Sequence, residues 1–227
     1  GAPLPVHPEK ICRIAYKEGH SEKYHFCHFK LPKQKETTPK ALSRENFEKL
    51  RDLEIPEKRR SHVITRDLFL FACYTGTAYA DAVSITRENL FQDDEGSLWL
   101  KYRRKKTDYL GRVKLLPEAL ALIGKYRDDT RITLFPPQDY HTLRANMKSL
   151  RLMAGLSQDL VYHMARHSFG TLTLTAGIPI ESIARMMGHT NIDSTQVYAQ
   201  VTDRKISSDM DRLMERRKPA AGKEAAG

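Results

Sequence analysis

The sequence predicts an α+β fold that is mostly α-helical and carries one small β-hairpin sheet. The chain has 227 residues, which suits one domain of ~150 residues with appended segments. After residue 42, apolar residues recur mainly at helical spacing, and only residues 98–116 show two strand-like segments around a turn. A hydrophobic content of 40% with 29% charged residues is ordinary for a globular protein and argues against wholesale disorder.

Helix start and stop signals define the expected helices. Ser43 can cap the first of them, and Pro117 suits the first turn of a later one. Gly76 and Gly177 each follow an apolar helical segment and supply stop signals. The helices expected on this basis span residues 43–53, 61–74, 79–85, 117–127, 140–154, 162–176, 180–187, 194–201 and 203–217.

The expected sheet is a hairpin. Residues 98–102 and 112–116 form its strands in this interpretation, with a turn at 108–111. Residues 1–42 have no helical period, and 24–29 could form a short strand.

Three parts are expected along the chain. Residues 1–42 form an N-terminal extension and linker, and residues 43–210 form the main domain. Residues 211–227 contain the end of a C-terminal helix and a disordered tail, because the last nine residues are rich in Ala, Gly and Lys.

Charge is the first indication of a partner. Lys and Arg number 38 against 28 acidic residues, which gives a net charge of +10. Such an excess suggests a polyanionic partner, and a solvated basic surface is the alternative. Cys12, Cys27 and Cys73 are odd in number and lack disulfide-like spacing, which favours a reducing, intracellular compartment.

Several function classes lack sequence support. No P-loop, no dinucleotide-binding glycine pattern and no G-x-S-x-G elbow is present. The longest apolar run, near residues 68–74, is far short of the ~20 residues that cross a bilayer, and no signal peptide is visible. We therefore predict no cofactor, no metal and no membrane partner. One N-terminal set of side chains invites a zinc interpretation, but its spacing matches no usual zinc pattern: Cys12, His20, His25, Cys27 and His28.

The C-terminal third carries the informative residues. His163, Arg166 and His167 stand at positions i, i+3 and i+4 of a predicted helix, so their side chains share a face. A guanidinium can bind two phosphate oxygens, and imidazoles exchange protons near neutral pH. His189 follows a helix-ending glycine, and Tyr198 comes nine residues later. Each residue alone is more simply explained by packing, whereas the ordered set indicates chemistry.

This order and spacing resemble the catalytic domain of the tyrosine recombinases, the phage-integrase family. In that family an H-x-x-R box precedes a G-H or G-W turn, and the nucleophilic tyrosine follows about nine residues later. Residues 74–81 also resemble the family's T-G-x-R-x-x-E segment, and Lys105-Lys106-Thr107 resembles its hairpin K-T. The resemblance covers roughly residues 43–210. Residues 35–43 look most like integrases of Bacteroidetes mobile elements.

The chain departs from the family pattern at one position. Ala78 stands where the family has its first arginine, while Asp81 keeps the acidic position. Arg66, Arg87 and Arg112 are candidates for a substitute cation, and the sequence does not choose between them.

Two adjacent lysines compete for the role of the hairpin lysine. Neighbouring strand residues point to opposite faces, so Lys105 and Lys106 are not expected to face the site together. The family pattern places the lysine directly before threonine. It therefore selects Lys106.

The resemblance implies a mechanism. Tyr198 would attack a DNA phosphodiester, form a 3′-phosphotyrosyl link and release a 5′-hydroxyl. Arg166 and His189 would bind the nonbridging oxygens, Lys106 would protonate the leaving oxygen, and His163 would assist as acid, base and donor. The bond energy is stored covalently, so neither ATP nor metal is required.

The resemblance also implies partners. They are double-stranded DNA with attachment sites, further copies of the chain in a tetramer on that DNA, and an accessory DNA-bending protein. The location would be the bacterial cytoplasm, at the nucleoid when bound to DNA. A type IB topoisomerase-like enzyme and a catalytically decayed DNA-binding module are the alternatives.

Overall fold

The computed structural model describes residues 8–23, 41–128, 130–196, 198, 210, 211 and 214. The chain divides into two compact units, Gly1–Thr37 and Thr38–Gly227. The first contains helix α1 (Pro8–Lys17). The expectation of no helix before residue 43 was therefore wrong, because Pro8 serves as a first-turn residue rather than as a breaker. The strand expected at residues 24–29 lies outside the described part.

The second unit confirms the mostly helical α+β fold. Ser43 caps its first helix, since its Oγ accepts a hydrogen bond from the Asn46 amide at 3.2 Å. The predicted helix at 194–201 is described as helical only up to Gln196, as part of α9, and most of the one at 203–217 lies outside the described residues. The helices are α2 (Arg44–Arg51), α3 (Arg60–Thr75), α4 (Tyr79–Ala82), α5 (Pro117–Lys125), α6 (Tyr140–Met153), α7 (His163–Thr175), α8 (Ile180–Met187) and α9 (Asp193–Gln196).

The sheet has three antiparallel strands in chain order, where a two-stranded hairpin was predicted. They are β1 (Leu90–Gln92), β2 (Leu98–Arg103) and β3 (Leu110–Lys114). The three residues of β1 are too few to show a strand period in the sequence. The β2–β3 turn spans residues 104–109, so the prediction of a turn at 108–111 was also displaced.

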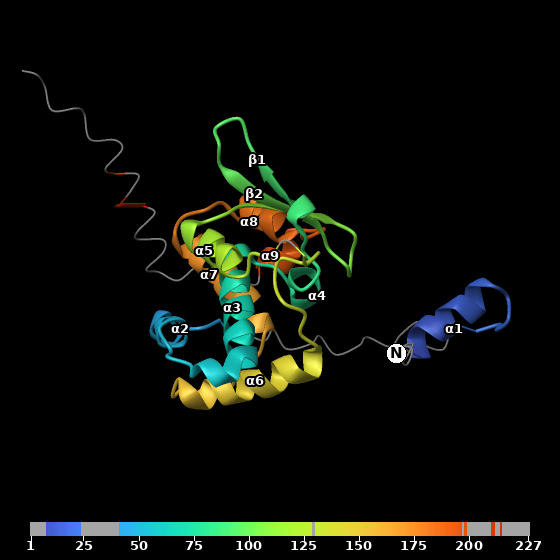
Figure 1. The fold of residues 1–227 in the computed structure, drawn as a ribbon. Coiled ribbons are helices and arrows are strands. Elements are labelled where there is room, and N and C mark those ends of the chain that lie inside the picture. The colour runs from blue at the N-terminus through green and yellow to red at the C-terminus, as the bar shows by residue number, and fades with distance from the viewer. Residues whose placement is uncertain are drawn as a thin grey trace, which may run out of the picture. The chain divides into compact units, whose positions relative to one another are not determined.

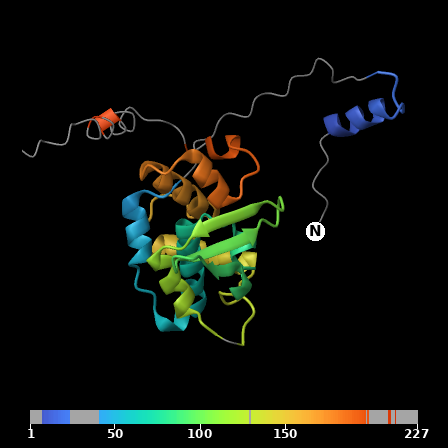
Figure 2. The ribbon, with the colours of Figure 1, turned by 90° about the horizontal axis from the view of Figure 1, so that it is seen from above.

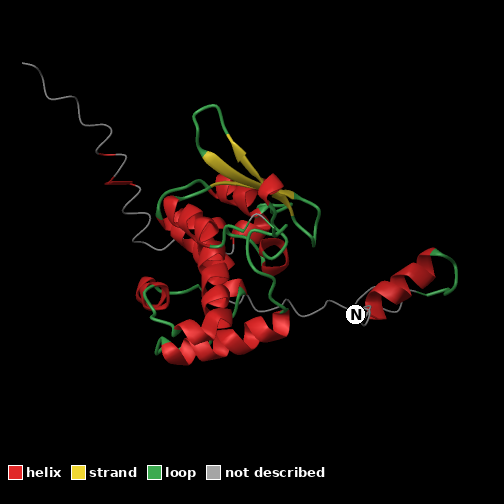
Figure 3. Cartoon of the chain, viewed as in Figure 1, coloured by secondary structure: helices red, strands yellow, loops and turns green. Residues whose placement is uncertain are grey.

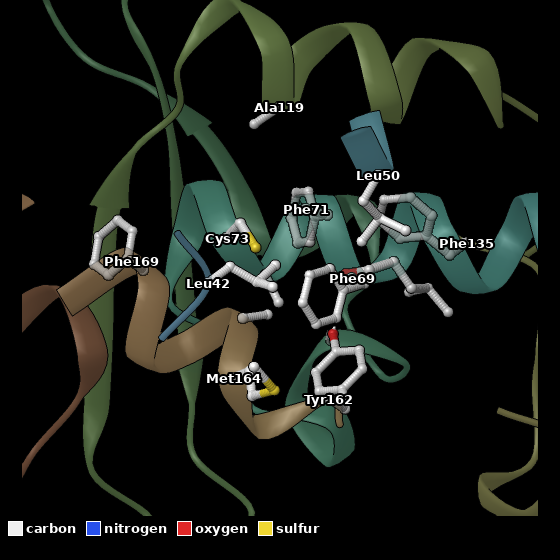
Figure 4. Packing of buried hydrophobic residues seen from close by; sticks show 14 of the residues in the cluster. Leu42, Leu50, Phe69, Phe71, Cys73, Ala119, Phe135, Tyr162, Met164 and Phe169 are labelled. Carbon is white, nitrogen blue, oxygen red and sulfur yellow. Dashed lines mark hydrogen bonds between the residues drawn. The ribbon is translucent and has the colours of Figure 1, made fainter. Parts of the chain in front are cut away.

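Helix α3 runs through the middle of the second unit (Figure 1). Its side chains Phe69 and Phe71 are fully buried. Figure 4 shows α3 between Ala119 of α5 and Met164 of α7. A helix buried on most of its surface is expected to be apolar on most of its faces, as this one is. The core therefore fixes α7, which carries the H-x-x-R box, against α3.

The strands gather at one end of the unit, and helices make up the rest (Figure 3). Helix α8 lies against strand β3 (Figure 2). One face of the sheet is buried through Leu100, Tyr102 and Val113. This packing brings the β2–β3 turn next to the end of α8. Among the residues described, no helix is long and apolar enough to cross a membrane.

A buried carboxylate joins α3 to α5. Asp67 is 1% exposed and accepts hydrogen bonds from Arg66 Nε at 2.9 Å and from the Tyr126 hydroxyl at 2.7 Å. Lys125 Nζ lies 2.6 Å from the same carboxylate. A buried charge needs such partners because desolvation is costly.

We expect Asp67→Ala to destabilise the protein by about 3–5 kcal/mol, because it leaves the largely buried Arg66 guanidinium without its counterion and the Tyr126 hydroxyl without its acceptor. Urea unfolding monitored by circular dichroism measures the change. Asp52→Ala is the matched control: it breaks an ion pair with Arg51 whose side chains are 64% and 45% exposed, and should leave the midpoint nearly unchanged. Equal midpoints for the two variants would contradict the assignment.

Candidate active site

Arg166 is the buried centre of the site. It projects from α7 and is 2% exposed. Its Nη1 donates to the Gly76 carbonyl and its Nη2 donates to the Met187 carbonyl at 2.7 Å. A guanidinium has five N–H donors, so three remain for other acceptors. The two carbonyls end α3 and α8, and Arg166 therefore holds three helices at one point.

Tyr198 lies against the same helix. Its Oη is 3.1 Å from Nδ1 of His167, and its side chain is buried. A Cβ at Gly170 would approach the Tyr198 ring to 2.7 Å, so a residue without a side chain allows this close contact. The rings of His163 and His167 stack edge to face at 4.3 Å. The predicted shared face of α7 is thus formed.

His189 enters the cluster from the turn after α8. Gly188 ends that helix with φ +61°, a left-handed conformation that favours glycine. Nδ1 of His189 is 2.7 Å from the Thr195 hydroxyl, which is fully buried. If that hydroxyl donates to Nδ1, the neutral ring keeps its proton on Nε2 and presents it as a donor.

The β2–β3 turn completes the cluster. The Lys105 amide donates to Asp81 Oδ1 at 2.9 Å, which fastens the turn to α4. Lys105 and Lys106 both lie in this turn, so the expected strand alternation does not apply to them. Burial lowers the pKa of His163, and the positive charges of Arg166, Arg104 and Lys106 lower it further. The Arg104 side chain points inward and is 14% exposed.

The three arginines proposed to replace the missing cation all lie elsewhere. Arg66 binds Asp67, and Arg87 donates to the Asp128 carbonyl at 2.6 Å. The Arg112 guanidinium lies over the Trp99 ring at 4.8 Å from its centroid. That expectation was wrong because each of them has partners outside the cluster.

Arg104 is an inward-facing cation that the sequence pattern did not single out. It stands in the run Arg103-Arg104-Lys105-Lys106, which resembles an ordinary solvated turn. Only tertiary packing shows that one of these four side chains turns inward. His167 was noticed for its helical face but received no role, although it contacts Tyr198.

Burial and positive charge control the protonation of the cluster. Burial lowers the pKa of His167 to about 4, and the neighbouring His163 and Arg166 lower it further. Burial also lowers the pKa of His189 to about 4, with Arg166 and Arg104 contributing. Burial raises the pKa of Tyr198, while Arg166 and Arg104 oppose this rise. The rings are therefore neutral at pH 7, and the tyrosine is protonated.

No group of three or more metal-ligating side chains occurs in the part of the chain that the structure describes. Cys12 and His20 of the N-terminal set are described, whereas His25, Cys27 and His28 are not.

The cluster combines a tyrosine, a buried arginine and histidines in an order seen in a known family. The model of the phage integrase family matches residues 40–205. The chain belongs to the phage integrase family. The match covers the cluster with the β2–β3 turn, so every site residue discussed above lies inside it.

Two curated relatives illustrate the relationship. The integrase of Escherichia phage P2 is 30% identical over 125 residues, which is 55% of this chain and 34% of the relative. The tyrosine recombinase XerC of Bradyrhizobium diazoefficiens is 23% identical over 223 residues, which is 89% of this chain and 65% of the relative. The chain thus spans between one third and two thirds of these proteins.

Solved structures share the fold. A lambda integrase dimer bound to a COC′ core site has a TM-score of 0.66 at 18% identity, covering 86% of this chain and 71% of that one. The Tn1549 transposon integrase in complex with transposon right end DNA has a TM-score of 0.65 at 16% identity, covering 91% and 76%.

The low histidine pKa values predict a pH dependence of stability. The unfolded histidines have a pKa near 6.5 and the folded ones near 4, so the unfolded chain binds more protons between these values. The stability that depends on the two histidines being neutral is fully present above pH 6.5 and is lost as the pH falls toward 4. We expect the double variant His167→Gln/His189→Gln to lose less stability than wild type across this window. Urea unfolding at a series of pH values measures the free energy of unfolding of both proteins. Equal losses of stability in the variant and in wild type across this window would contradict the low pKa values of the two histidines.

Proposed function

We propose that this chain is the catalytic part of a site-specific DNA recombinase that integrates and excises a mobile element. It would cleave and rejoin DNA through a 3′-phosphotyrosyl intermediate. The observation that carries the proposal is the convergence of Tyr198, Arg166 and His189 at one point, inside a region that matches the phage integrase family.

The reaction is a phosphoryl transfer. The Tyr198 oxygen attacks the scissile phosphorus and passes its proton to water, while the P–O5′ bond breaks and the leaving 5′-oxygen takes up a proton. The pentacoordinate transition state gathers negative charge on the nonbridging oxygens, so fixed donors stabilise it. Three N–H groups of Arg166 remain after its two carbonyl contacts, and Nε2 of His189 adds a neutral donor. The reverse attack by another 5′-hydroxyl rejoins the strands.

Lys106 is the proposed general acid for the leaving 5′-oxygen. It is exposed at the tip of the β2–β3 turn, and its charge reaches His163. His163 is itself exposed at the start of α7 and lies ready to donate to the substrate. The long lysine side chain on a turn suits a group that must reach a DNA backbone.

His167 is better suited to holding Tyr198 than to deprotonating it. A histidine with a pKa of about 4 is a weak base toward a phenol whose own pKa is raised. The 3.1 Å contact instead fixes the tyrosine hydroxyl in the free protein. Since Tyr198 is 8% exposed, DNA binding must uncover it before attack.

The proposed partners follow from the family. They are double-stranded DNA with attachment sites, a tetramer of the recombinase on that DNA, and an accessory DNA-bending protein. The net charge of +10 supports a DNA partner. The proposed source is a Bacteroidetes mobile element in the bacterial cytoplasm, on the similarity of residues 35–43. The division into a linker, a catalytic domain at 43–210 and a tail stays a prediction.

Tyr198→Phe should abolish the covalent protein–DNA adduct and leave DNA binding nearly intact, because it removes only the attacking oxygen. A nicked suicide duplex of the element's own end, followed by denaturing electrophoresis in EDTA, measures the adduct. Tyr162→Phe is the control: the Tyr162 hydroxyl is buried and donates to the Leu68 carbonyl at 3.2 Å. An adduct that persists in Tyr198→Phe would place the nucleophile elsewhere. Joining of strands between two duplexes would separate a recombinase from a topoisomerase.

Lys106→Ala should slow cleavage by ~10²–10⁴-fold, the usual contribution of a positioned general acid. Lys105→Ala is its neighbour in the same turn and should have a small effect. Replacing the leaving 5′-oxygen with sulfur should restore the rate of Lys106→Ala, because a thiolate leaves without protonation. A sulfur substrate that gives no rescue would remove Lys106 from this role.

A further inference from the structure

Arg104 is set apart from its basic neighbours by its burial. Its side chain is 14% exposed, whereas Arg103 beside it is 67% exposed and pairs with the exposed Asp108. The Arg104 stem crosses Gly188, where an added Cβ would come within 3.0 Å of Cδ. Gly188 immediately precedes His189. The backbone therefore leaves a passage for this side chain into the cluster.

The Arg104 guanidinium has contacts on the protein, but they do not use all of its hydrogen-bond donors. Its Nε lies 3.7 Å from Asp81 Oδ2, an ion pair too long for a hydrogen bond, and its Nη1 donates weakly to the Gly188 carbonyl at 3.4 Å. Among the described residues, the buried Nε has no hydrogen-bond partner. A buried donor without a partner is costly, so a site that keeps one is expected to use it for a ligand.

The positive charge of Arg104 acts on the titratable groups of the proposed reaction centre. Burial is the main cause that lowers the pKa of His163, His189 and Arg166, and the charge of Arg104 lowers it further; burial raises the pKa of Tyr198, and Arg104 opposes that rise. The guanidiniums of Arg104 and Arg166 repel one another, and this repulsion adds to burial in lowering the pKa of Arg166. An anion between them would remove that repulsion, and a phosphodiester supplies an anion with two nonbridging oxygens.

Resting on the function proposed above, we propose that Arg104 is a catalytic residue that binds a nonbridging oxygen of the scissile phosphate opposite Arg166. It takes over the charge that is absent at Ala78. Asp81 holds it from one side, and the same carboxylate holds the turn through the Lys105 amide at 2.9 Å. A guanidinium on the β2–β3 turn thus takes the place of the one that the family has at the position of Ala78, just before α4.

The test compares two variants that differ only in the guanidinium. Arg104→Ala alone leaves the Asp81 carboxylate buried without a counterion, which could unfold the protein. Asp81→Asn neutralises that carboxylate, and its amide oxygen can still accept the Lys105 amide. The informative pair is therefore Asp81→Asn and Asp81→Asn/Arg104→Ala, with Arg103→Ala as a control for diffuse charge. Thermal unfolding and DNA binding are recorded for every variant.

The rate of adduct formation is measured on the nicked duplex of the element's own end. Loss of Arg104 should slow it by ~10²–10³-fold, the usual effect of one transition-state donor, whereas Arg103→Ala should stay near the wild-type rate. A second duplex carries a methylphosphonate at the scissile position, which removes one negative charge from the phosphate. On that duplex the difference between the paired variants should narrow, because less charge needs compensation.

The outcomes separate this inference from the function on which it rests. A wild-type chain that forms no adduct on its own element end overturns the recombinase proposal. A wild-type adduct with equal rates for the paired variants overturns only the role of Arg104. A deficit of equal size on both duplexes would assign Arg104 a structural part, and this too would overturn the inference.

Discussion

The site depends on one buried guanidinium. Arg166 binds the carbonyls that end α3 and α8 while it projects from α7, so one side chain sets the relation of three helices. A buried arginine is tolerated only where its donors are satisfied, and here backbone carbonyls satisfy part of them. The same contacts hold the guanidinium near Tyr198 and His189, where its charge acts on the pKa of both. Folding and the arrangement of the site are therefore coupled through one residue.

A second constraint acts through Asp81. This carboxylate is 3% exposed and contacts both the backbone and a side chain of the β2–β3 turn. It converts a surface hairpin turn into a fixed part of the cluster. The position of Arg104 and the direction of the turn cannot be altered separately, since both depend on the same two oxygens.

Local sequence signals predicted the helices well where caps and glycines are explicit. Ser43 and Gly76 mark helix ends that the structure reproduces. They failed for α1, where Pro8 begins a helix, and for β1, which is too short to show a period. The ordered motif selected His163, Arg166, His189 and Tyr198, and their catalytic roles stay a prediction. Arg104 was beyond sequence reasoning, because the inward turn of one cation among four is decided by Asp81 and Gly188, far away in the chain.

If the chain is the recombinase proposed above, the contact between Tyr198 and the surface of α7 would also limit unintended cleavage of DNA. The hydroxyl rests against His167, and the ring lies over Gly170. Under the function proposed above, a tyrosine covered in this way would not cut a duplex during an unspecific contact, and cleavage would require a DNA complex that rearranges the protein. Gly170, which admits the Tyr198 ring, would then help to limit unintended strand breaks.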